Sequence, residues 1–204
     1  MIPDPDPLLA DDVVTLRRPD LGDLPAIEAG ITDPEVVRWF GQPGASAIDV
    51  LALNRRRWMS GSPTLAICEA RGPCVGHVWV NVSADDTSIG YVGYWLLPEA
   101  RGRGLATRAV RLVSTWATRD IGLTRLRLLT EPTNIRSQQV AERAGYRRIR
   151  LLRDHDRIDG RSIDHVLFEW SPMATEDRLD VSEAEVEGRK DASGPSLPGR
   201  IAPR

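Results

Sequence analysis

The stretch Pro98-Glu99-Ala100-Arg101-Gly102-Arg103-Gly104-Leu105-Ala106-Thr107 connects an aromatic-rich strand pattern at 89–97 to the clearest helical pattern of the chain, at 104–119. The N-terminus of a helix has about four unpaired N–H groups and the positive end of the helix dipole. Gly102 and Gly104 leave those groups without covering side chains, and Arg101 and Arg103 add positive charge. The stretch therefore predicts a cradle for a phosphate group. The alternative is an ordinary exposed loop whose glycines only allow the chain to turn.

The order of elements around this stretch predicts an α+β (mixed α/β) fold. Runs of β-branched and apolar residues predict strands at 13–18, 64–69, 75–82, 89–97, 126–130, 148–153 and 163–170. Apolar residues at helical spacing predict helices at 21–28, 33–40, 47–59, 104–119 and 137–144. Three of the strands follow one another without a helix between them. We therefore expect a central, mostly antiparallel sheet of six to seven strands flanked by helices, and not the regular alternation of a doubly wound sheet.

Length and composition fit one domain with a tail at each end. The chain has 204 residues, of which 41% are hydrophobic and 27% charged, which is enough to bury a sizeable core. Residues 1–11 are rich in proline and aspartate, so we expect a flexible N-terminus. Residues 171–204 contain no aromatic residue and carry both charges, which is typical of a disordered tail. A helix at 174–186 is the alternative. The folded domain is thus expected at 12–170.

Several classes of protein are excluded by what the sequence lacks. The apolar runs are short and broken by charges, so we expect no membrane-spanning helix. The start of the chain has neither the basic residues nor the apolar stretch of a secretory signal, which favours a cytoplasmic protein. Cys68 and Cys74 are too few for a disulfide scaffold or a zinc site. We expect them to be thiols on neighbouring strands in a reducing cytosol, and we expect no metal.

The distribution of charge points to an anionic partner. Residues 101–161 contain fifteen arginines and six acidic residues, so this segment carries +9 while the whole chain carries −2. The glycine stretch lacks the Gly-Lys-Ser/Thr end of a nucleotide P-loop and the three-glycine spacing of dinucleotide sites. The sequence also lacks the interleaved basic and exposed aromatic residues of a nucleic-acid stacking platform, so nucleic acid is not the expected partner.

Arg101, Gly104 and Ala106 form an Arg-x-x-Gly-x-Ala pattern that resembles the pyrophosphate-binding motif of the GNAT superfamily of N-acetyltransferases. Further matching segments follow in order and spacing: Gly93-Tyr94-Trp95-Leu96, Ala106-Thr107-Arg108-Ala109-Val110, Asn134-Ile135-Arg136-Ser137 and Ala144-Gly145-Tyr146. They resemble the RimJ/RimL branch, whose named members acetylate the N-termini of ribosomal proteins. Leu16-Arg17-Arg18-Pro19 and Asp33-Pro34-Glu35-Val36 also look like that branch. The resemblance covers roughly residues 12–170 and implies a GNAT-like fold with acetyl-CoA as co-substrate.

The resemblance also implies which residues hold the coenzyme. The strand ending at Leu96 and Leu97 would separate from the next strand, and its freed backbone groups would bind the pantetheine arm. Backbone amides of the loop would hold the pyrophosphate, and the Thr107 hydroxyl would add a contact. These amides belong to Arg101, Gly102, Arg103, Gly104, Leu105, Ala106 and Thr107. Asn134 would reach the coenzyme from the end of the next strand; the alternative for Asn134 is a plain helix N-cap.

The catalytic groups depart from the common family pattern. Many GNAT enzymes protonate the departing thiolate with a tyrosine seven residues after the asparagine, but Ala141 stands there in this chain. The resemblance instead offers Ser137 as the acid, with a helix-cap serine as the alternative. Where related enzymes have a glutamate base, this chain has Tyr91, and a tyrosine with its ordinary pKa of about 10 is a poor base. The other candidates are Asp164, for which a structural hydrogen bond is the alternative, and His165, His155 or water.

The missing carboxylate favours an acceptor that is easily deprotonated. An α-amine has a pKa of about 7.7–8.0 and a lysine amine about 10.4, so only the former is partly neutral near pH 7. We therefore expect a protein or peptide N-terminus, or another small primary amine, with Trp39 and Tyr91 lining its site. Trp39 could instead belong to the core. The competing functions are a non-catalytic acyl-CoA-binding regulator and an RNA- or ribosome-binding module. The chain is expected to be a monomer or a homodimer.

The tail composition makes a first prediction. A chain that ends at Ser171 should keep both its melting temperature and its acetyl-CoA affinity, because residues 172–204 carry too little apolar surface to fold alone. Thermal unfolding and calorimetry on the full-length and shortened chains measure both quantities. A substantial drop in either one would show that the tail docks on the domain.

Overall fold

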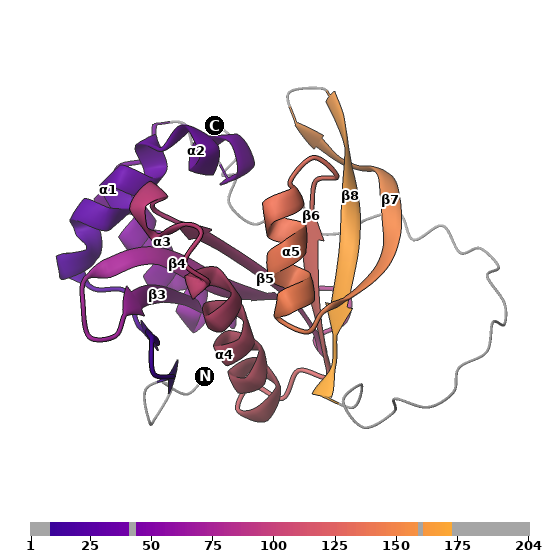
Figure 1. The fold of residues 1–204 in the computed structure, drawn as a ribbon, viewed down its shortest axis with the longest axis horizontal. Coiled ribbons are helices and arrows are strands. Elements are labelled where there is room, and N and C mark those ends of the chain that lie inside the picture. The colour runs from indigo at the N-terminus through magenta and orange to yellow at the C-terminus, as the bar shows by residue number, and fades with distance from the viewer. Residues whose placement is uncertain (1–8, 41–43, 159–160, 173–204) are drawn as a thin grey trace, which may run out of the picture.

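The computed structural model describes residues 9–40, 44–158 and 161–172. These residues form one eight-stranded sheet in the order β1-β2-β3-β4-β5-β6-β8-β7 (Figure 1). The strands are β1 (Leu9–Ala10), β2 (Val14–Arg17), β3 (Thr64–Glu69), β4 (Cys74–Val82), β5 (Ile89–Leu96), β6 (Arg125–Thr130), β7 (Arg147–Ile158) and β8 (Arg161–Trp170). The α-helices are α1 (Leu24–Thr32), α2 (Pro34–Phe40), α3 (Ala47–Met59), α4 (Leu105–Arg119) and α5 (Ile135–Arg143). Beyond Pro172, the tail expected at 171–204 lies outside the described residues.

The strand pairing confirms the expected α+β class and the mostly antiparallel sheet. Only β5 and β6 pair in parallel; every other pair of neighbours among the described strands is antiparallel. The sheet has one strand more than the six to seven expected. The additional strand is β1, two residues within the segment 1–11, where Leu9 pairs with Leu16. So short a strand has no alternation of apolar and polar residues that a sequence pattern could show.

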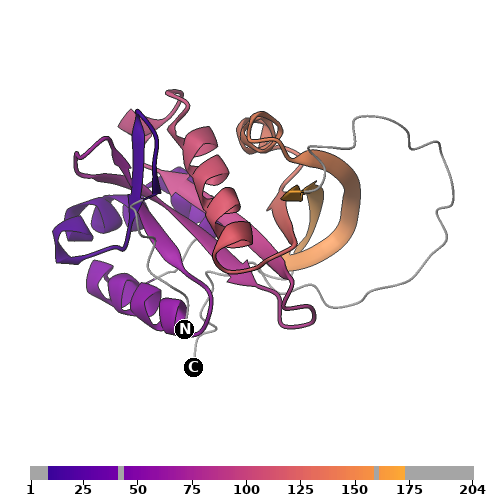
Figure 2. The ribbon, with the colours of Figure 1, turned by 90° about the horizontal axis from the view of Figure 1, so that it is seen from below.

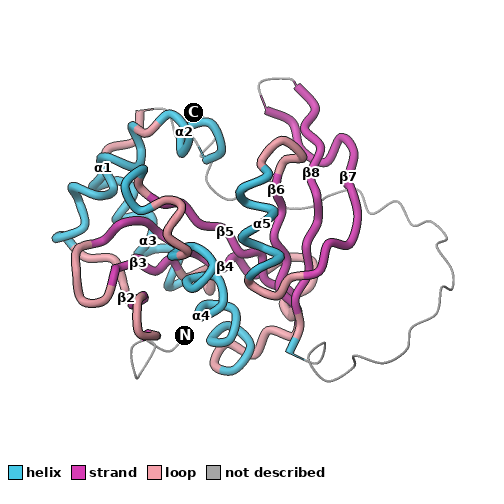
Figure 3. The backbone as a smooth tube through the Cα atoms, in the orientation of Figure 1, coloured by secondary structure: helices cyan, strands magenta, loops and turns pink. Residues whose placement is uncertain are grey.

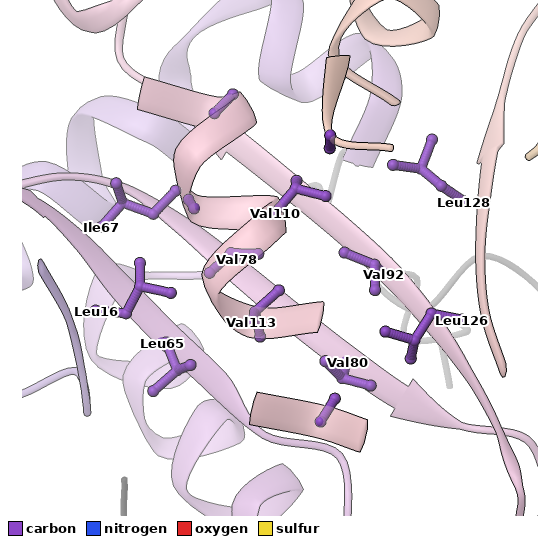
Figure 4. Close-up of a cluster of buried hydrophobic side chains, with 14 of the residues drawn as sticks. Leu16, Leu65, Ile67, Val78, Val80, Val92, Val110, Val113, Leu126 and Leu128 are labelled. Carbon is purple, nitrogen blue, oxygen red and sulfur yellow. The ribbon is translucent and has the colours of Figure 1, made fainter. Parts of the chain in front are cut away.

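Helix α4 covers one face of the sheet and forms the main core. Val110 and Val113 of this helix are fully buried against side chains of the central strands (Figure 4). Those strand residues come from β2 to β6: Leu16, Leu65, Ile67, Val78, Val80, Val92, Leu126 and Leu128. The apolar positions of α4 recur with the period of a helix that buries one face on a sheet, which is why its pattern is the clearest helical pattern in the sequence.

Helices α1 and α3 cover the opposite face of the sheet (Figure 2). A Cβ atom at Gly30 of α1 would lie 2.7 Å from the ring of Trp95, so only glycine allows the helix to approach the strand this closely. His77 stacks on Trp95 with ring centroids 4.9 Å apart, and burial lowers its pKa to about 4, so it is a neutral core residue. Cys68 and Cys74 are free, buried thiols that stand opposite each other on the neighbouring strands β3 and β4.

Strands β5 and β6 separate after only three paired positions. The parallel pairs are Ile89 with Arg125, Gly90 with Leu126 and Tyr91 with Arg127, whereas β5 continues to Leu96 and β6 to Thr130. Figure 3 shows the two strands diverging, with β6, β8 and β7 on one side of the gap and β3 to β5 on the other. Because both strands are parallel, their C-terminal ends open at the same end of the sheet. This separation places the candidate site.

Candidate active site

A cleft opens where β5 and β6 separate. Its cavity has a volume of about 140 Å³ and is open to solvent. Its walls come from α2, the end of β5, the glycine loop, the start of α4 and α5. The lining residues are Glu35, Val36, Trp39, Tyr94, Trp95, Leu96, Arg101, Gly102, Ala106, Asn134, Arg136, Ser137 and Val140. Six residues predicted from the sequence to bind coenzyme or acceptor, together with Ser137, thus meet in one cavity: Trp39, Leu96, Arg101, Gly102, Ala106 and Asn134.

The glycine loop leads directly into the first turn of α4. Gly102 and Gly104 have φ angles of +73° and +78°, a left-handed conformation that favours glycine. Gly104 is the N-cap of α4 and provides no side-chain cap. The first helical hydrogen bond runs from the Arg108 N–H to the Gly104 carbonyl, so the N–H groups of residues 105–107 have no partner within the helix. Apart from the adjoining residues, no atom of the described residues lies within 4 Å of a Cβ atom built on either glycine, which leaves space for an anion against these amides.

The arginine side chains of the loop are directed toward carboxylates. Arg101 donates to the Leu96 carbonyl at 3.0 Å, to Glu35 at 2.8 Å and to Asp33 at 2.6 Å. Arg103 pairs with Glu69 on β3. The positive charge that the sequence suggested for a phosphate is therefore already matched by acidic side chains. The groups that remain for the predicted phosphate cradle are the backbone amides at the N-terminus of α4.

Arg101 thereby joins the glycine loop to helix α2. Pro34 begins that helix and Asp33 accepts a hydrogen bond from the Val36 N–H, as expected for an N-cap acid followed by proline. Burial alone would raise the pKa of Asp33, but the hydrogen bonds from Val36 and Arg101 lower it below its ordinary value. Glu35 and Trp39, two and six residues after Asp33, both line the cleft. Sequence reasoning missed Glu35 because its partner Arg101 lies 66 residues further along the chain.

Ser137 lies opposite β5 and is hydrogen-bonded through two groups. Its backbone N–H donates to Oδ1 of Asn134 at 3.1 Å, so Asn134 is the N-cap of α5 as well as a lining residue. Its Oγ accepts a hydrogen bond from the Tyr94 hydroxyl at 3.2 Å. Burial, partly opposed by the bond to Ser137, raises the pKa of Tyr94 to about 12. Tyr94 was not among the predicted site residues. Its spacing of two from Leu96 could have indicated it, because alternate strand residues point to the same face.

The remaining predicted residues lie outside the lining of the cleft. Asp164 accepts the Asp154 N–H at 2.9 Å within the β7–β8 hairpin, a geometry that matches its structural alternative. Tyr91 stands at the last β5–β6 pair, where its hydroxyl accepts from Arg127 at 3.4 Å. His155 and His165 contact each other in that same hairpin, and burial lowers the pKa of both.

The loop residues differ in what they turn toward the cleft. The side chains of Leu105 and Thr107 are buried in the first turn of α4, so any contact from them with a ligand falls to the backbone. Arg103, Gly104 and Leu97 flank the lining without being part of it. Among the described residues, no group of three or more histidine, cysteine, aspartate or glutamate side chains could hold a metal ion. None of the described helices is both long and apolar enough to cross a membrane.

The chain resembles proteins of known families over most of this fold. Among sequence relatives, an uncharacterized N-acetyltransferase p20 of Bacillus licheniformis is 24% identical over 161 residues, covering 76% of this chain and 90% of that protein. Two Bacillus subtilis N-acetyltransferase relatives, 35% and 31% identical, are matched over only 41% and 42% of their own lengths.

Solved structures share the fold. Mycobacterium smegmatis RimJ in complex with CoA-disulfide superposes with a TM-score of 0.70 at 22% identity, covering 80% of this chain and 84% of that one. Spermidine N-acetyltransferase of Vibrio cholerae, solved with CoA and spermine, gives a TM-score of 0.69 at 18% identity, covering 80% and 98%. The sequence model of a protein family, the acetyltransferase (GNAT) domain, matches residues 14–147 of this chain. This range includes the gap between β5 and β6, the glycine loop and Ser137. This chain belongs to the GNAT acetyltransferase family.

Proposed function

We propose that this enzyme transfers the acetyl group of acetyl-CoA to a primary amine, either the N-terminal α-amine of a protein or peptide or a small amine. The observation that carries the proposal is one continuous cleft. It joins the unpaired amides at the start of α4 to the Ser137–Tyr94 hydroxyl pair. An anion site and a proton-donating hydroxyl group are the two features that a thioester with a phosphate-bearing tail requires.

The residues around the cleft fit the coenzyme along its length. The amides of residues 105–107 and the open space over Gly102 and Gly104 suit a pyrophosphate. Beyond Tyr91, β5 has no further paired position with β6, so backbone groups on that edge between Tyr91 and Leu96 are available for the amides of the pantetheine arm, whereas the Leu96 carbonyl accepts from Arg101. Acetyl-CoA supplies an activated acetyl group; binding it and directing it at the acceptor are the tasks of these residues. The CoA-bound RimJ and spermidine acetyltransferase structures, which share the fold, support this assignment.

The acid and base assignments follow from what the cleft contains. Ser137 is our candidate for the group that assists departure of the thiol, since it is the hydroxyl that lines the cleft with a proton to give. Asp164 does not line the cleft, and Glu35 already accepts a hydrogen bond from Arg101. We therefore assign no side chain as the base. Water suffices for an α-amine that is partly neutral near pH 7, which supports an α-amine or a small amine over lysine.

The basic segment gives little support to an RNA- or ribosome-binding module. Many of its arginines pair with acidic side chains: Arg101, Arg103, Arg108, Arg119, Arg125 and Arg127. The non-catalytic acyl-CoA-binding regulator shares the same coenzyme site and is separated from the enzyme only by turnover.

A turnover screen tests the proposed function. Acetyl-CoA is incubated with the protein and a panel of N-terminal peptides, polyamines and aminoglycosides, and mass spectrometry identifies the products. We expect acetylation of an α-amine peptide or a small amine, without acetylation of internal lysine side chains. Tight binding of acetyl-CoA with no product from any acceptor would favour the regulator instead.

The glycine cradle makes a prediction about affinity. Gly104→Glu should weaken acetyl-CoA binding by at least about 2 kcal/mol, roughly 30-fold in Kd, because it places a carboxylate at the anion site. Gly104→Ala is the control for backbone strain, since φ is +78° there but a Cβ atom meets no neighbour. The alanine variant should lose stability and keep most of its affinity. Unchanged affinity of a folded glutamate variant in calorimetry would refute the pyrophosphate assignment.

The position of Ser137 makes a second prediction. Ser137→Ala should lower kcat about 10–100-fold and leave acetyl-CoA affinity nearly unchanged, because the phosphate contacts lie at α4. The effect is at the low end for acid catalysis, since a thiol of pKa about 8.5 is already a tolerable leaving group. The structure gives the N-cap role to Asn134, so the alternative for Ser137 is a structural role through its bond to Tyr94. Steady-state rates and a melting curve on the same variant separate the two roles. Full activity with a lower melting temperature would leave Ser137 as a structural residue only.

A further inference from the structure

Tyr94 and Ser137 form a hydroxyl pair across the gap between β5 and α5. Tyr94 is on the strand that leaves β6, and Ser137 is in the first turn of the helix that follows β6, 43 residues later. Both residues line the cleft, and the Tyr94 ring packs against the main core cluster, which fixes the position of its hydroxyl. The pair is thus built into the site on two rigid elements.

The direction of this hydrogen bond determines where the Ser137 proton can point. A serine hydroxyl has one proton and two acceptor lone pairs. Tyr94 donates to Ser137 Oγ and occupies one of those lone pairs, while the Ser137 N–H is held by Asn134. Within the described part of the chain, no hydrogen bond uses the Ser137 hydroxyl proton. That proton is therefore left to donate into the cleft.

Tyr94 itself is poorly suited to lose a proton. Burial raises its pKa to about 12, and the nearby carboxylate of Glu35 acts in the same direction. Loss of the proton would leave a buried phenolate beside a carboxylate, which is costly in a region of low polarity. Tyr94 therefore stays protonated over the pH range in which an amine acetyltransferase works, and it remains a hydrogen-bond donor to Ser137.

We propose that Tyr94 is a positioning residue for acetyl transfer: its hydroxyl donates to Ser137 Oγ and directs the Ser137 proton toward the sulfur of the departing coenzyme. This inference rests on the proposed function. When the amine nitrogen has bonded to the acetyl carbon, the C–S bond breaks and its electron pair stays on sulfur. Ser137 stabilises that charge by a hydrogen bond, and the proton lost by the amine reaches the sulfur through solvent.

A double-mutant cycle tests the dependence of Ser137 on Tyr94. Tyr94→Phe should lower kcat about 3–10-fold, with the KM for acetyl-CoA unchanged. Because the two hydroxyls act as one unit, Tyr94→Phe should cost nothing further in the Ser137→Ala background. In the Ser137→Thr background, which keeps a hydroxyl, it should again lower kcat. Losses that multiply in the alanine background would mean that Tyr94 acts alone as an acid, and an unchanged kcat in Tyr94→Phe would overturn the proposal.

The chain provides a matched control for the loss of a buried hydroxyl pair. The hydroxyl oxygens of Tyr146 and Ser114 lie 2.7 Å apart and form a hydrogen bond. This pair lies in the core between α4 and β7, away from the cleft. Tyr146→Phe should lower the melting temperature at least as much as Tyr94→Phe, and its kcat should stay at the wild-type value. A kcat loss in Tyr146→Phe equal to that in Tyr94→Phe would reduce the role of Tyr94 to general stability.

Titration of bound CoA gives a readout that does not depend on turnover. A hydrogen bond from Ser137 stabilises a thiolate, so the thiol of CoA bound to the wild-type protein should titrate below the pKa of free CoA measured in the same buffer. Ultraviolet absorbance of the thiolate should show this shift reduced in Tyr94→Phe and in Ser137→Ala, but not in Tyr146→Phe. The same titration in wild type and Tyr94→Phe would overturn the inference. A Tyr94-dependent shift in a protein that acetylates no amine would uphold the positioning and refute the proposed function.

Discussion

The early separation of β5 from β6 is the constraint on which the rest of the site depends. Parallel neighbours cannot be joined by a hairpin, so the chain between them must cross over, and here it does so through the glycine loop and α4. The crossover brings the N-terminus of α4 to the end of the sheet where the two strands diverge. An unpaired strand edge and the positive end of a helix dipole therefore open into the same cleft. Three paired positions are enough to hold the strands together, and the residues that follow are left for a ligand.

Arg101 links the two sides of this cleft. Its guanidinium contacts the end of β5 through the Leu96 carbonyl and the start of α2 through Asp33 and Glu35. Five donors in a rigid planar group allow one side chain to satisfy three acceptors, which a lysine could not do in the same geometry. The backbone of the loop is thereby held beside the helix that carries Trp39. The motif arginine thus connects the two sides of the cleft, and in the function we propose the anion is bound by backbone amides.

The sequence predicts the local features of this protein well and the long-range ones poorly. Helix α4 and the glycine loop follow from apolar spacing and from two residues that tolerate positive φ, and both are present. The strand at Leu9–Ala10 is too short for any pattern, and the partners of Arg101 lie 66 and 68 residues away in sequence. The motif Gly93-Tyr94-Trp95-Leu96 contains Tyr94 but assigns it no role, although strand alternation places Tyr94 on the same face as Leu96. Pairings between distant elements depend on how the strands separate, which composition and spacing do not encode.

The charges around the cleft bear on the kind of acceptor that the enzyme can use. Glu35 has a guanidinium donor at 2.8 Å, so withdrawing a proton from an ammonium would compete with an existing ion pair. The Tyr94 hydroxyl donates to Ser137 Oγ, and neither hydroxyl can accept a proton from an ammonium without becoming cationic. In the proposed reaction, a cleft with these groups would assist the departing thiol far more than it would assist the attacking amine. We therefore propose an acceptor amine that arrives neutral, and among protein amines the α-amino group has the pKa that makes this arrival frequent near pH 7.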